Sequence, residues 1–72
     1  MSRFDEPAPP LWRCVDGRPL ACVEKIRVLD DNYRELAQVL RDALADGILL
    51  GCAEGALRAA LHELVERVRP GF

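Results

Sequence analysis

A chain of 72 residues is long enough for one small domain, and a domain this small usually needs a metal, a disulfide or a partner chain to complete its core. Half of the residues are apolar and 31% are charged, which is the composition of a folded protein and not of a disordered one. Acidic and basic residues are interleaved and the net charge is −2, which disfavours a dedicated nucleic-acid binder. No apolar run approaches the roughly 20 residues of a membrane span or the core of a secretory signal, so we expect a cytoplasmic protein without membrane segments.

Residues 1–19 are predicted to form an irregular N-terminal arm. Asp16-Gly17 is a turn signal, which leaves a short hairpin and a bare turn as alternatives. The prolines that block a continuous helix in this segment are Pro7, Pro9, Pro10 and Pro19. Apolar side chains that could dock onto another element are Phe4, Leu11, Trp12, Val15 and Leu20.

A long first helix is predicted to begin near Pro19 to Ala21 and to end at Gly47 or Gly51, of which Gly51 is the better left-handed cap. Apolar or small residues recur in alternating steps of four and three, as in a heptad repeat. These positions are Cys22, Ile26, Leu29, Tyr33, Leu36, Leu40, Ala43, Gly47 and Leu50. Side chains spaced for contacts across one helical turn are Arg27 with Asp31, Asp30 with Arg34, and Gln38 with Asp42.

A rival interpretation starts this helix near Tyr33. Asp30-Asp31-Asn32 is a poor helix interior, and Asn32 followed by Glu35 resembles a capping box. Residues 22–29 would then form a strand paired with the arm. We favour the continuous helix because the heptad register runs through the acidic triplet.

A second helix is predicted from Cys52 or Ala53 to Val68, before Pro70-Gly71. Its apolar residues share one face, and Glu54–Arg58 and Glu63–Arg67 are spaced for ion pairs. The connection between the helices is short, so they must run antiparallel. Residues 20–70 are therefore predicted to form an all-α antiparallel helical hairpin.

The two predicted helices differ in length, about 45 Å for the first and about 24 Å for the second. The second can cover only the C-terminal half of the first. Either the arm covers the remaining half through Leu11 and Trp12, or a second chain does, giving a dimeric four-helix bundle. We favour the homodimer, with a contribution from the arm, because a lone hairpin leaves one side of each helix exposed to water. The predicted interaction residues are Trp12, Val23, Ile26, Leu29 and Tyr33.

Three cysteines, Cys14, Cys22 and Cys52, are the candidate thiol residues, and with His62 they supply the four ligands of a zinc site. Cys22 and Cys52 lie at opposite ends of the first helix, so one chain cannot bring them to one metal. A site shared between two chains and a Cys14–Cys22 disulfide are weaker alternatives. We expect free thiols, with Cys22 in the apolar seam, Cys52 as a buried small residue at the hairpin turn and Cys14 in the arm.

No catalytic pattern is present in the sequence. His62 lies off the apolar face without an obvious partner, and a hairpin of this size encloses little space for a substrate. Trp12, Phe4 and Tyr33 could stack on nucleic-acid bases, but docking of Trp12 on the first helix is the simpler explanation. The sequence therefore predicts a non-enzymatic interaction or accessory module that acts as a homodimer without a cofactor. The alternative is a thiol- or metal-dependent sensor that uses the three cysteines.

Overall fold

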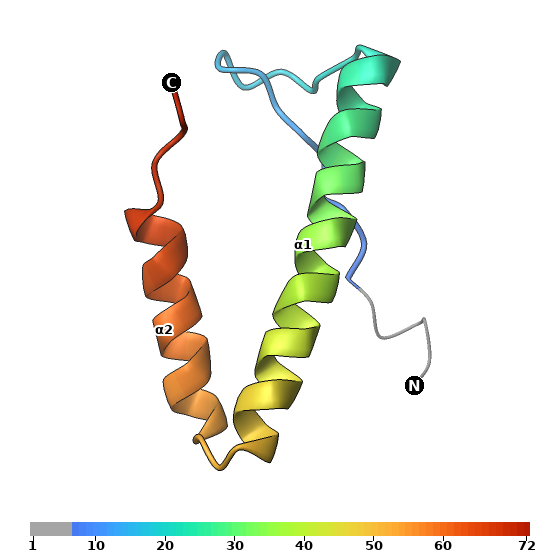
Figure 1. Ribbon diagram of the computed structural model, residues 1–72. Helices are drawn as coiled ribbons and strands as arrows, with labels where there is room; N and C mark the ends of the chain where they lie inside the picture. The colour runs from blue at the N-terminus through green and yellow to red at the C-terminus, as the bar shows by residue number, and fades with distance from the viewer. Residues whose placement is uncertain (1–6) are drawn as a thin grey trace. The chain divides into compact units, whose positions relative to one another are not determined.

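The computed structural model describes residues 7–72, and Phe4 lies outside this range. Two helices account for the regular structure of the described residues, α1 over Val23–Leu49 and α2 over Glu54–Arg67 (Figure 1). The predicted all-α helical hairpin is thereby confirmed. The chain divides into two compact units, one that ends at Val39 and one that runs from Leu40 to Phe72. The proposed boundary between an arm at 1–19 and a hairpin domain at 20–70 stays a prediction.

Helix α1 is continuous through Asp30-Asp31-Asn32, as the heptad register predicts. The rival interpretation, with a strand over residues 22–29, is wrong. The helix begins at Val23 rather than near Pro19 to Ala21, because the preceding residues are held in a turn. Pro19 pairs with Arg13 in an isolated antiparallel bridge, and the Leu20 N–H donates to the Trp12 carbonyl at 2.8 Å.

Arg27 and Arg34 of α1 each pair with an acidic residue three positions earlier, rather than with the predicted Asp31 and Asp30. Arg27 lies 3.9 Å from Glu24, and Arg34 lies 3.9 Å from Asp31. All four side chains are largely exposed, so these pairs contribute little to stability.

Gly51 ends α1 as the sequence predicts. Its φ of 96° is in the left-handed region that glycine adopts without strain. The Gly51 N–H donates to the Ile48 carbonyl at 3.0 Å, and the Cys52 N–H donates to the Gly47 carbonyl at 2.9 Å. These two bonds make a Schellman motif, which satisfies carbonyls at the helix end and reverses the chain.

Helix α2 starts at Glu54 and ends at Arg67, one residue inside the predicted limits at each end. The predicted ion pairs are confirmed, with Glu54–Arg58 at 2.9 Å and Glu63–Arg67 at 3.3 Å. The two helices approach closely at Gly47, where an added Cβ would lie 2.6 Å from both Cδ atoms of Leu57. A residue without a side chain is therefore what allows the backbone of α1 to approach α2 here.

Within residues 7–72, no side chain is buried as fully as a core residue. The best-covered apolar residues are only half-buried, among them Ile26, Leu29, Leu44, Leu57 and Leu61. Neither helix in residues 7–72 is long and apolar enough to cross a membrane. The described residues therefore contain no fully buried core.

Candidate interaction surface

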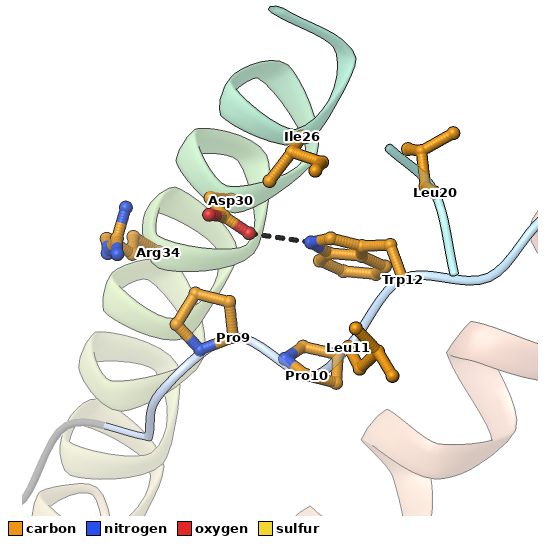
Figure 2. Close-up of a pocket in the computed structure, with 8 residues that line it drawn as sticks. All are labelled: Pro9, Pro10, Leu11, Trp12, Leu20, Ile26, Asp30 and Arg34. Atoms are coloured by element: carbon orange, nitrogen blue, oxygen red, sulfur yellow. Dashed lines mark hydrogen bonds between the residues drawn. The ribbon is translucent and has the colours of Figure 1, made fainter. Parts of the chain in front are cut away.

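Trp12 joins the N-terminal segment to the first half of α1 (Figure 2). Its indole Nε1–H donates to Asp30 Oδ1 at 2.6 Å, and its ring meets Tyr33 edge-on, with ring centroids 5.9 Å apart and planes at 75°. Edge-to-face pairs of this kind add about 0.5–1.5 kcal/mol to the burial of the rings. Asp30 lies inside a helix, where an acidic residue is unfavourable, and its carboxylate serves there as the acceptor for the Trp12 indole.

A small pocket of about 160 Å³ surrounds this contact. Figure 2 shows Pro10 and Leu11 below Trp12, and Ile26 and Asp30 of α1 above it. The full lining is Pro9, Pro10, Leu11, Trp12, Leu20, Ile26, Asp30 and Arg34. Segments separated in the sequence are therefore brought together here by one aromatic residue.

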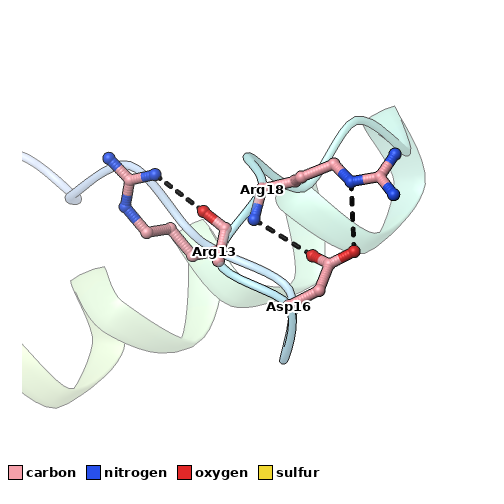
Figure 3. A network of polar contacts seen from close by, with 4 residues as sticks. Arg13, Asp16 and Arg18 are labelled. Carbon is pink, nitrogen blue, oxygen red and sulfur yellow. Dashed lines mark hydrogen bonds and ion pairs between the residues drawn. The ribbon is translucent and has the colours of Figure 1, made fainter.

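A tight turn after Trp12 positions the segment that leads into α1 (Figure 3). The Cys14 N–H donates to the Arg18 carbonyl at 2.8 Å, and Gly17 adopts a φ of 89°. Asp16 accepts from the Arg18 N–H at 3.0 Å and pairs with Arg18 Nε at 3.1 Å, while Arg13 donates to the Gly17 carbonyl at 2.9 Å. Of the two alternatives, the short hairpin-like turn is the one formed.

The five predicted interaction residues do not share one environment. Trp12, Ile26, Leu29 and Tyr33 are half-buried, and Trp12 contacts Tyr33 directly. Val23 remains 67% exposed. The N-terminal segment therefore covers much of the surface that the sequence assigned to either this segment or a second chain.

A different apolar surface on α1 is exposed to solvent. Leu36 and Val39 are 61% and 62% exposed, and with Asn32 and Glu35 they line a shallow hollow of about 350 Å³. The four positions are spaced i, i+3, i+4 and i+7, which is the set that forms the hole for one knob of a facing helix. We call this set the α1 hole.

An exposed apolar strip covers the last turn of α2 and Val68, the residue that follows the helix. Leu64, Val65 and Val68 are 54%, 69% and 61% exposed. We call these three residues the α2 strip. Arg67 lies next to it in the sequence, and its exposed side chain pairs with Glu63.

All three cysteines are free and exposed. The prediction that Cys52 is buried at the hairpin turn is therefore wrong. In residues 7–72, no group of three or more cysteine, histidine or acidic side chains is placed to hold a metal ion. Cys22 is not a seam residue within the helix, because it directly precedes α1 and its carbonyl accepts the first helical bond, from the Ile26 N–H at 3.0 Å. Backbone N–H groups of Lys25 and Glu24, with the nearby Lys25 charge, lower the pKa of the Cys22 thiol against an opposing desolvation effect.

The lowered pKa of Cys22 can be tested in a variant in which Cys14 and Cys52 are replaced by serine, so that Cys22 is the one remaining thiol. The rate of alkylation by iodoacetamide should rise through its midpoint at a lower pH in the native chain than in the same chain unfolded in urea, because the folded helix stabilises the thiolate. A thiol pKa that is depressed on folding stabilises the protein above the unfolded pKa, and this contribution is lost as pH falls through the folded pKa. Coincident midpoints for native and unfolded chains would contradict the assignment.

No family model matches this chain, and no curated protein or solved structure matches it significantly.

Proposed function

We propose that the chain is a small helical protein–protein interaction module that acts as a homodimer. The observation that carries the proposal is the lack of any fully buried side chain in residues 7–72, although half of the whole sequence is apolar. A folded domain gains most of its stability from burying apolar surface, so this chain needs more cover than the described contacts supply. The three free thiols fit a reducing compartment, which is why we place the module in the cytoplasm.

The test is the mass of the purified chain in solution. Sedimentation equilibrium across the micromolar range should give twice the 8.0 kDa of one chain, with dissociation on dilution. A mass of one chain at every concentration would refute the homodimer.

A thiol sensor is the second candidate. Its support is the exposed Cys22 thiol at the start of α1, whose pKa is lowered. Oxidation by hydrogen peroxide should then change the oligomeric mass of the wild type and leave that of Cys22→Ser unchanged. Identical masses before and after oxidation in both proteins would remove this candidate.

A further inference from the structure

The proline-rich segment that leads to Trp12 is covered by α1 along one side and open to solvent along the rest. We propose that its open side is a ligand for a protein domain that binds polyproline II helices in an aromatic-lined groove with an acidic side chain at one end. Every residue of this ligand lies within residues 7–13, so the proposal goes beyond the homodimer and does not depend on it.

Three prolines determine the backbone of this segment. Pro7, Pro9 and Pro10 each fix φ at about −65°, and a residue that precedes a proline is pushed into the extended region. No helix or strand is formed over residues 7–12. Consecutive restrictions of this kind give a polyproline II helix, which has about three residues per turn. Side chains three positions apart therefore lie along the same edge of the segment.

One edge of the segment is held by α1. Pro9 and Trp12 are three positions apart, and both are half-buried. They line one pocket with Ile26 and Asp30 of α1, and the Trp12 indole donates to Asp30 at 2.6 Å. This anchoring fixes the backbone of the segment before a partner binds, which lowers the entropic cost of binding.

The other two edges are open to solvent. Pro7 and Pro10 share one of them and are both exposed, although Pro10 also borders the pocket. On the next edge, Ala8 is exposed and Leu11 is 62% exposed. Domains that recognise Pro-x-x-Pro segments bind a proline edge of this kind between aromatic side chains. The chemistry of the open side therefore fits a partner with an aromatic-lined groove.

The charge at the end of the segment defines the groove further. Arg13 follows Pro10 by three residues, which is the spacing of one turn. Its side chain is exposed, and one of its N–H groups donates to the Gly17 carbonyl at 2.9 Å. The planar guanidinium has further donors, and their arrangement suits a carboxylate. We therefore expect an acidic side chain at the end of the groove that meets Arg13.

Titration calorimetry of the full chain against a panel of purified Src-homology 3 and WW domains tests the proposal. At least one domain should bind, and Pro10→Ala and Arg13→Glu should each raise its dissociation constant about tenfold. The matched control is Pro70→Ala, which changes an exposed proline outside the segment and should leave the dissociation constant unchanged.

The unfolding of two proline variants in urea distinguishes a surface for a partner from one that the chain itself covers. Both Pro9→Ala and Pro10→Ala remove the restriction that proline places on the unfolded chain, but only Pro9 is half-buried, so Pro9→Ala should lower the stability more. Equal losses would show that the chain itself covers the edge of Pro10, and this would overturn the proposal. Binding to no domain of the panel, or binding that is unchanged by both Pro10→Ala and Arg13→Glu, would also overturn it.

Discussion

Replacing Trp12 by alanine is expected to lower the free energy of unfolding by about 3 kcal/mol, a large share of the stability of a small domain. The substitution removes the edge-on contact with Tyr33 and leaves Asp30 without its indole donor. Because Trp12 is only half-buried, the loss should fall at the lower end of the range for tryptophan in a core. Urea unfolding followed by far-ultraviolet circular dichroism, at one fixed protein concentration, measures the change.

Two further variants separate the ring from its hydrogen bond. Trp12→Phe keeps an aromatic ring and loses the indole N–H, so it should cost about 1 kcal/mol. Val15→Ala changes a fully exposed side chain in the same segment and should be nearly neutral. If Trp12→Ala costs no more than Val15→Ala, the docking of the N-terminal segment on α1 does not contribute to stability.

Gly47→Leu is expected to destabilise the protein by about 2 kcal/mol, although leucine is the better helix former. The new Cβ would lie 2.6 Å from the Leu57 side-chain ends, so the contact between α1 and α2 must open or Leu57 must leave its position. Unfolding by urea gives the loss, and the two helices should remain visible by circular dichroism.

The matched control is Gly55→Leu, because an added Cβ at Gly55 meets nothing within 4 Å. This variant should be neutral or stabilising through helix propensity alone. A chain that combines Gly47→Leu with Leu57→Ala should lose less stability than the sum of the two single variants, since the second removes the clash created by the first. Strict additivity would show that Gly47 and Leu57 do not contact each other.

Local sequence patterns predicted most of the fold. The heptad register carried α1 through the acidic triplet, and Gly51 marked the reversal because only a residue without a side chain adopts its φ freely. The ion pairs of α2 followed from spacing alone. These features depend on residues a few positions apart, which is the range over which helical geometry is fixed.

Contacts between residues far apart in the sequence were harder to predict. The spacing rule paired Asp30 with Arg34, whereas its carboxylate accepts from Trp12, eighteen residues away. Periodicity shows that a helix has an apolar stripe but not which part of it another segment covers, so the α1 hole was missed. Its polar members, Asn32 and Glu35, also lie outside the apolar seam. The signal that could have revealed it is the i, i+3, i+4, i+7 spacing around Leu36 and Val39.

The prediction for the Cys22 thiol depended on where α1 begins. The predicted start near Ala21 placed Cys22 inside the helix, and a shift of two residues moved it to the position before the first turn. Cap positions change the hydrogen-bond partners of a side chain completely, so a small error in a boundary changes the chemistry expected of the residue.

The Trp12–Asp30 bond and the Gly47–Leu57 approach both join residues fewer than twenty positions apart in the sequence. Helical chains in which most contacts are local are expected to fold within microseconds to milliseconds. Each unit can complete its own contacts without waiting for the other, because only α1 is common to both. If two copies then associate, the encounter between chains becomes the slow step, and its rate is set by how much protein is present rather than by the folding of either chain.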